Sequence, residues 1–367
     1  MVSTPSASAS SASAACASAP TDLLLFTTSP NPLTLRYPRP YKPVLVLPPL
    51  LHRALHAALD QDPPSALLQQ PLPHSGRRTL VIPQPDSLLK HDLPLASETD
   101  AEVTLKLHLV ADGTTEERVA WVEEALRILA SHKGLSGADH LLVGFRGVDY
   151  KGKKTAASEF FGCGAEGLES GMGSEHVAPE TEHQVLEIWE RLQSLVNDKP
   201  EANGNGAITS NGDGDAQIRP HVKDLGTLYF PLALLKRTVH SGAPPSINAL
   251  DTPDCHHLPK EYTEFAKSAG VELWAGGGGE GAELLPAAEL HNLLQEFSSP
   301  LSTLLGSTPS SEPSPLSQLI PLRDDMLKYE TVPPGVAVRW VLGYTVVSKA
   351  RNLVQDKGYI VAAQLAV

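Results

Sequence analysis

The sequence predicts an α/β fold in which helices cross over between parallel strands, most simply a (β/α)8 barrel of the TIM type with loop insertions. Strand and helix patterns alternate about seven times between residues 79 and 357, the order expected when helices connect parallel strands. Asp139–Phe145 (DHLLVGF) is almost wholly apolar, as is typical of a strand covered on both faces. A closed barrel and an open doubly wound sheet both fit the alternation, and the number of units favours the barrel.

Length and composition fit this interpretation. The chain has 367 residues, 41% of them apolar, which is enough for a sizeable core. Its 32 prolines and 28 glycines indicate long loops. We interpret residues 1–20, rich in Ser and Ala, as a disordered tail. We interpret residues 21–367 as a single barrel domain with insertions at about 146–180, 197–219 and 298–317.

Charge and cysteine content restrict the classes of partner and compartment. A net charge of −13 argues against nucleic acid or an anionic membrane as partner, because phosphate binding needs clustered Lys and Arg. The three cysteines, Cys16, Cys163 and Cys255, form no disulfide framework and fit a reducing compartment. No run approaches the ~18 apolar residues of a membrane span. Residues 1–20 also lack the basic residues of a transit peptide. We therefore expect a soluble, cytoplasmic protein.

The N-terminal part predicts short elements. The prolines between Pro38 and Pro43 indicate that residues 21–49 hold no long helix and no central strand. A helix is predicted over Leu50–Leu59 and a strand over Thr79–Pro83.

Regular units begin at Val103–Val110 (VTLKLHLV), where apolar and polar residues alternate with the period of a strand. Thr114 and Glu117 then form a capping-box pattern that opens a helix. After the strand at Asp139–Phe145, the predicted elements are a helix at Glu182–Val196, a strand at Val222–Tyr229, a helix at Pro231–His240, a strand at Ser246–Leu250, a helix beginning at Pro259, a strand at Val271–Ala275 and a helix at Pro286–Phe297.

The last stretch, Arg339–Gln364 (RWVLGYTVVSKARNLVQDKGYIVAAQ), is expected to complete the α/β array. We predict a helix over Val336–Leu342, a strand over Tyr344–Val347, and a basic helix over Lys349–Lys357 that Gly358 ends.

Lys106 is the first candidate for chemistry. It shares the polar face of its predicted strand with Thr104 and His108, and in a barrel this face would point inward. A partly buried lysine beside a histidine suits acid–base catalysis. A solvated strand face explains the same pattern, and this simpler interpretation is favoured.

Lys349, Arg351 and Lys357 form a basic cluster that begins just after a predicted late strand. Loops after the late strands of a barrel commonly bind anions. Three solvated positions of a helix explain the cluster equally well.

Three other patterns are not interpreted as sites. Gly276–Gly281 follows a strand but matches neither dinucleotide nor P-loop spacing, and Glu280 would repel a phosphate. Asp254–His257 (DCHH) lacks the second ligand pair that zinc needs, so no metal is expected. Cys163 has no identifiable base, so nucleophilic catalysis is not supported.

The closing stretch carries a family likeness. Arg339–Arg351, followed by Asp356–Ile360, resembles the end of the regulatory, or modifier, subunit of glutamate–cysteine ligase. Further segments resemble the same family: Pro259–Leu273, Val103–Val110 with Lys106, and Ala138–Val143. That family is similar to the aldo-keto reductases, so the resemblance implies an aldo-keto reductase-like (β/α)8 barrel.

The resemblance also bears on catalysis. Aldo-keto reductases use an Asp, Tyr, Lys and His tetrad, in which Lys106 matches the lysine and Gly144 stands in the place of the histidine. No Asp followed four residues later by Tyr precedes Lys106, so the proton donor has no counterpart. We therefore expect no catalytic residue and interpret Lys106 as vestigial. No cofactor is expected, although Lys349 and Arg351 fall where reductases hold the NADPH phosphate, which leaves vestigial NADPH binding open.

The function implied by the resemblance is that of a non-catalytic subunit. It would form a heterodimer with the catalytic subunit of glutamate–cysteine ligase, raise its glutamate affinity and weaken glutathione feedback inhibition in glutathione biosynthesis. The partner- or phosphate-binding candidates are Arg339, Lys349, Arg351 and Lys357. An intersubunit disulfide through Cys163 or Cys255 is left open. The alternatives are an active NADPH-dependent aldo-keto reductase and a barrel scaffold for another protein.

Overall fold

The computed structural model describes residues 21–28, 47–61, 67–69, 78–85, 101–135, 137–148, 150, 177–197, 221–250, 258–275, 284–305, 319–322, 335–349 and 353–366. The strands are β1 (Thr21–Phe26), β2 (Leu67–Gln69), β3 (Thr79–Ile82), β4 (Ala101–Leu109), β5 (Gly137–Phe145), β6 (His221–Leu228), β7 (Ile247–Leu250), β8 (Glu272–Ala275), β9 (Ile320–Pro321), β10 (Gly335–Ser348) and β11 (Leu353–Ala366). The helices are α1 (Leu47–Leu59), α2 (Thr115–Lys133), α4 (Pro179–Leu192), α5 (Ser194–Asn197), α6 (Leu232–His240), α7 (Lys260–Ser268), α8 (Ala287–Glu296) and α9 (Ser298–Leu305).

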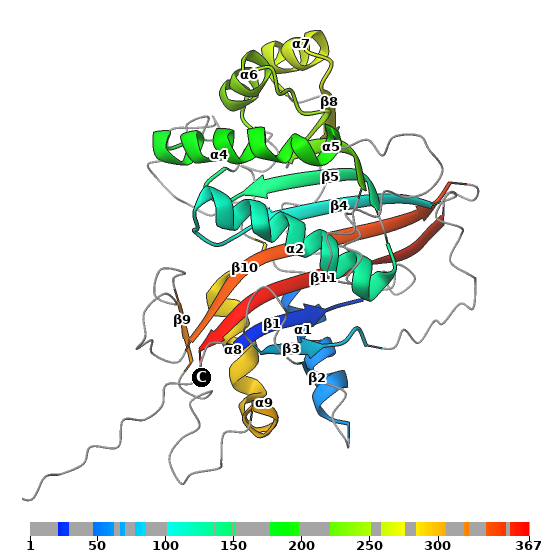
Figure 1. The fold of residues 1–367 in the computed structure, drawn as a ribbon, viewed down its shortest axis with the longest axis vertical. Helices are drawn as coiled ribbons and strands as arrows, with labels where there is room; N and C mark the ends of the chain where they lie inside the picture. The colour runs from blue at the N-terminus through cyan, green and yellow to red at the C-terminus, as the bar shows by residue number, and fades with distance from the viewer. Residues whose placement is uncertain are drawn as a thin grey trace, which may run out of the picture.

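All these strands belong to one mixed sheet with helices packed against it, which confirms the α/β class. The strand order is β2-β3-β1-β11-β10-β4-β5-β6-β7-β8, and β9 pairs with the start of β10 (Figure 1). In the described part of the chain, no pairing joins β2 to β8, so this sheet is open.

The parallel part of the sheet matches the sequence prediction closely. Strands β4 to β8 are parallel neighbours in chain order, and α2, α4 with α5, α6 and α7 connect them in turn. The predicted capping box begins α2: the Thr114 hydroxyl accepts from the Glu117 amide, and the Glu117 carboxylate accepts from the Thr114 amide at 2.8 Å. Gly134, with φ of 66°, ends the helix in the left-handed conformation that glycine tolerates best.

The C-terminal stretch has a different structure from the one predicted. The helices predicted over Val336–Leu342 and Lys349–Lys357 are wrong, because the first is the start of β10 and residues 353–357 belong to β11. The two strands form a long antiparallel hairpin, and β10 also pairs antiparallel with β4. The hairpin therefore lies in the middle of the sheet and does not add a last crossover unit. A strand buried on both faces shows no alternation, which is why residues 335–342 read as a helix.

One other prediction, on the N-terminal segment, is wrong. β1 is a fully buried internal strand between β3 and β11, although the prolines nearby argued against a central strand in residues 21–49. Those prolines follow β1 and do not interrupt it, so it keeps its strand pairing. Part of the predicted insertion at 298–317 is the helix α9, which buries Leu301 in the core.

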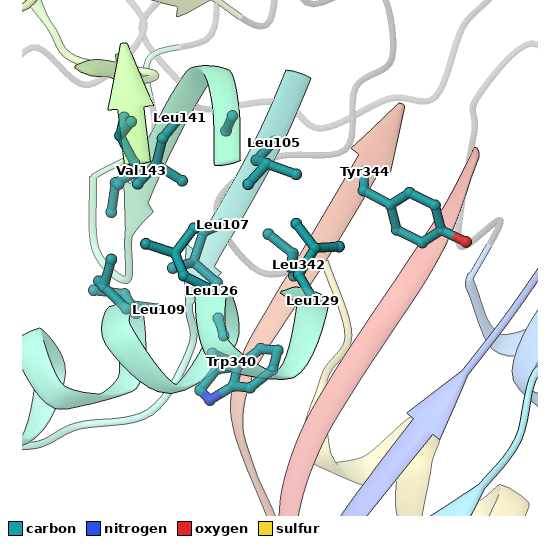
Figure 2. Packing of buried hydrophobic residues seen from close by; sticks show 14 of the residues in the cluster. Leu105, Leu107, Leu109, Leu126, Leu129, Leu141, Val143, Trp340, Leu342 and Tyr344 are labelled. Atoms are coloured by element: carbon teal, nitrogen blue, oxygen red, sulfur yellow. The ribbon is translucent and has the colours of Figure 1, made fainter. Parts of the chain in front are cut away.

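The described residues form two large hydrophobic cores on opposite faces of the sheet, and a smaller one in which α6 and α7 pack on β5, β6 and β7. Helices α2 and α4 cover one face, and in Figure 1 α2 crosses in front of β4, β10 and β11. Leu126 and Leu129 of α2 pack there on leucines of β4 and on Leu342 (Figure 2). Helices α1, α8 and α9 cover the other face, over β1, β3, β11 and the first half of β10. None of the helices in the described residues has the length and apolar character needed to cross a bilayer.

Candidate functional site

Burial along β10 changes abruptly at Gly343. Residues 335–342 are buried throughout, because helices cover both faces, whereas from Gly343 onward half-buried and buried residues alternate. The residues that alternate inward, including Tyr344 and Val346, face α2. Those that alternate outward mark a part of the opposite face that the described helices leave open to solvent.

Nine side-chain positions on three adjacent strands make up this surface, which we call the open face. Strand pairing aligns them in three rows: Lys106, Gly343 and Tyr359; then Thr104, Thr345 and Lys357; then Glu102, Val347 and Val354. Each row takes one position from β4, one from β10 and one from β11. All nine are half-buried or exposed, and Val354 is 51% exposed, the most of any large apolar side chain in the described residues.

The structure brings two of the candidate cations together on the open face. Lys106 lies on β4 and Lys357 on β11, in neighbouring rows with β10 between them. No ion pair or hydrogen bond holds either ammonium group within the described chain. By contrast, Lys133 and Lys349 are each paired with a carboxylate. The open face therefore carries two positive charges that the described residues do not neutralise.

The β5 side of the open face is bordered by His140. Its Nε2 lies 3.7 Å from the Glu102 carboxylate, and its Nδ1 lies 3.3 Å from that of Asp224. The Trp274 ring meets the imidazole edge-on, with centroids 5.2 Å apart. The two carboxylates face different ring nitrogens, so the three groups do not converge on one point as metal ligands would. Within the described residues no group of His, Cys, Asp or Glu is arranged to hold a metal ion, and Asp254–His257 lies outside them.

Lys349 follows β10 in the hairpin turn, where its ammonium lies 3.4 Å from the Asp139 carboxylate of β5. That carboxylate also accepts a hydrogen bond from the Val103 amide. Lys349 therefore ties the tip of the hairpin to the parallel strands. Arg351 lies outside the described residues, as do Cys163 and Cys255.

Arg339 lies at the other end of β10 and on the opposite face. It is the extra residue of a β-bulge between Val338 and Trp340, and a bulge places two successive side chains on nearly the same side of a strand. The guanidinium, only 9% exposed, lies 3.1 Å from the Glu124 carboxylate of α2 and 3.8 Å from that of Asp22 in β1. The Trp340 indole donates to the second Glu124 oxygen at 3.0 Å. Contacts inside the chain thus account for the charge of Arg339.

The position that Gly144 occupies is also enclosed. It pairs with His108 across β4 and β5, and a Cβ atom there would lie 3.2 Å from Leu228 and 3.5 Å from the His108 ring. His108 itself is 1% exposed, and its ring lies beside that of Tyr229. A histidine at position 144 would have to displace these buried side chains.

A further cluster of polar side chains lies beneath the C-terminal end of α2. No sequence pattern indicated it. The Lys133 ammonium contacts Gln84, lies 3.1 Å from the Asp356 carboxylate and sits 4.8 Å above the Tyr344 ring. The Tyr344 hydroxyl donates to the other Asp356 oxygen at 3.3 Å, and Figure 2 shows it reaching toward β11. A second bulge, with Gln355 as the extra residue, lets Asp356 face α2.

Burial sets the protonation of this cluster. It lowers the pKa of the Lys133 ammonium, and the Asp356 carboxylate opposes that change. Burial, reinforced by Asp356, raises the pKa of the Tyr344 hydroxyl. A tyrosine held neutral in this way is a poor proton donor for catalysis, so the cluster fastens α2 to the hairpin.

The Lys133 shift predicts a pH dependence of stability. A lysine whose pKa is lower in the folded chain binds fewer protons there than in the unfolded chain, so the free energy of unfolding rises as pH passes up to about 10.4. We expect the stability difference, the unfolding free energy of the parent chain minus that of Lys133→Met, to rise as the pH is raised toward about 10.4. Urea unfolding followed by circular dichroism measures it. A difference that stays constant as the pH is raised would contradict the shift.

Comparison of the chain with protein-family models, with curated proteins and with solved structures finds no match. The chain is an α/β protein, and its open face lies on the middle strands of the sheet. The functional assignment therefore rests on the residues of that surface and on the resemblance of the hairpin stretch.

Proposed function

We propose that this chain is a non-catalytic regulatory subunit of glutamate–cysteine ligase, which binds the catalytic subunit and tunes its glutamate affinity and glutathione inhibition. One observation carries the proposal. The stretch that resembles this family forms a hairpin whose outward side chains contribute to a half-exposed face on the sheet. Such a face suits a protein partner better than a small substrate, which needs an enclosing pocket.

We propose further that β4 to β8 and their helices correspond to part of an aldo-keto reductase-like (β/α)8 barrel. Four successive crossovers between parallel neighbours support this. In the proposed relationship, the antiparallel hairpin takes up positions beside β4 where a barrel would continue with parallel strands.

The arrangement around Lys106 favours regulation over reductase activity. The reductase tetrad needs a histidine at the position of Gly144, where Leu228 and His108 fill the space. Lys106 itself forms no hydrogen bond or ion pair with a described residue that could orient it for proton transfer. Both features support a chain that contributes binding energy and no reacting group.

The test is copurification with the catalytic subunit of glutamate–cysteine ligase, followed by the glutamate KM of the ligase with and without this chain. A regulator of this type typically supplies about 1–3 kcal/mol of coupling, so we expect a KM about 5- to 150-fold lower in the complex. Weaker inhibition by glutathione should accompany it.

Two outcomes would contradict the proposal. One is the absence of both a complex and a kinetic change, which would leave a scaffold for another protein. The other is NADPH oxidation with a panel of aldehydes that disappears in Lys106→Met, which would show an active reductase.

A further inference from the structure

We propose that the open face is the docking surface for the catalytic subunit and that it receives an acidic segment of that subunit between Lys106 and Lys357. The proposal rests on the regulatory function proposed above and adds the surface and the chemistry of its partner. It is argued from the strand register, the burial pattern and the charges of the described residues.

Charge is the first argument. Among the lysines of the described residues, Lys133, Lys236, Lys260 and Lys349 each pair with a carboxylate. The other four, Lys106, Lys223, Lys267 and Lys357, have no partner carboxylate in the described residues, and of these Lys106 and Lys357 lie in neighbouring rows of one face. Two neighbouring ammonium groups that no described carboxylate pairs with attract carboxylates on a partner and disfavour a basic partner.

The second argument concerns what lies between the two lysines. Gly343 has no side chain, and its position is bordered by the Tyr359 ring, 3.2 Å from where a Cβ atom would lie. Thr104 and Thr345 are paired in the next row and offer two hydroxyl groups. A partner carboxylate lying over β10 would therefore find ammonium groups on both sides and hydroxyl donors beside them.

Apolar surface favours a protein over a free anion. Val347 and Val354 are paired in the third row, and Val354 is one of two large apolar side chains that the described residues expose. The main-chain amide groups of β10 are used in pairing with β4 and β11. They are therefore not free to bind an anion, unlike the amide groups at the N-terminus of a helix. A small anion would gain little here, whereas a protein segment would use both the charges and the valines.

The acidic residues near β5 restrict where an acidic segment of the partner can lie on this surface. Glu102, in the third row of the open face, and Asp224 of β6 lie beside different nitrogens of His140, so negative charge gathers on the β5 side of the face. An acidic segment is then held in register over β10 and β11, since sliding toward β5 would bring like charges together.

The experiment compares charge reversal on the open face with charge reversal elsewhere. Lys106→Glu/Lys357→Glu is the test variant, and Lys106→Gln/Lys357→Gln is a milder one for use if the first does not fold. Lys223→Glu/Lys267→Glu is the matched control, because both lysines are exposed on other surfaces, in β6 and α7. The dissociation constant for the purified catalytic subunit is measured by biolayer interferometry at about 50 and about 300 mM NaCl.

We expect the test variant to raise the dissociation constant about 10- to 100-fold at low salt and the control to change it less than about threefold. Salt should weaken binding of the parent chain more than that of the Gln variant. Equal affinities for the test and control variants would overturn the docking surface while leaving the regulatory function in place. Failure of the parent chain to bind would overturn both. Self-association of the parent chain that Lys106→Glu/Lys357→Glu abolishes would assign the face to a second copy.

Discussion

Replacing Arg339 with Met is expected to cost about 3–5 kcal/mol of unfolding free energy, the range for removing one partner of a buried ion pair. The guanidinium bridges the carboxylates of Glu124 and Asp22, and its loss leaves two negative charges close together with little solvent. Urea unfolding of the isolated chain measures the cost. The result separates a structural role from partner contact, since no partner is present.

Two companion variants make the Arg339 result specific. Arg339→Lys retains the charge but not the forked geometry that reaches both carboxylates, so we expect an intermediate cost. Arg339→Met combined with Glu124→Gln and Asp22→Asn removes all three charges and should recover part of the loss. An Arg339→Met chain as stable as the parent would show that the carboxylates do not depend on this residue.

Replacing Asn248 with Ala is expected to be equally costly, about 3–5 kcal/mol, because the buried Thr227 hydroxyl and Phe230 amide lose their acceptor and two further buried bonds are removed with it. The Asn248 oxygen accepts from the Thr227 hydroxyl at 3.0 Å and from the Phe230 amide at 3.3 Å. Its nitrogen donates to the Phe230 carbonyl and to the Tyr262 hydroxyl. These bonds hold the turn after β6, where Tyr229 adopts a φ of 64°, a strained value for a residue with a side chain.

A matched substitution shows whether burial is the cause. Asn292 is an exposed asparagine of α8, and Asn292→Ala should change the unfolding free energy by less than about 0.5 kcal/mol. Thermal unfolding of both variants beside the parent gives the comparison. Similar melting temperatures for Asn248→Ala and Asn292→Ala would mean that the turn does not need its buried amide.

The parallel part of the fold could be predicted from the sequence because its signals are local. The alternation in Val103–Val110, the capping residues Thr114 and Glu117, and the stop at Gly134 each act within a few residues of the element they define. The hairpin could not be predicted in this way. Its pairing partners are β4 and β1, far away in the chain, and its first half is apolar on both faces.

The open face could be predicted only in pieces. Lys106 and Lys357 were both identified as candidates, but their common surface depends on β10 lying between them. Arg339 was predicted to be a partner- or phosphate-binding candidate because it opens the stretch that carries the family resemblance. Its actual partner, Glu124, comes from α2, and only the bulge at Arg339 turns it toward that helix. A lone arginine inside an apolar run is a signal of a buried pair that sequence reasoning can use.

The central position of the hairpin in the sheet also affects the order in which the protein can fold during synthesis. β1 pairs with β11, in a register that joins Thr21 to Leu365. β1 is therefore synthesised long before the strand with which it pairs. Until then β1 and β4 have unpaired edges, which are prone to aggregation and invite chaperone binding. The parallel units can fold as they emerge, whereas closing the long-range pairs is slow. The face that β4 shares with β10 and β11 therefore forms only after translation of the hairpin, and any partner that recognises it must join after that point.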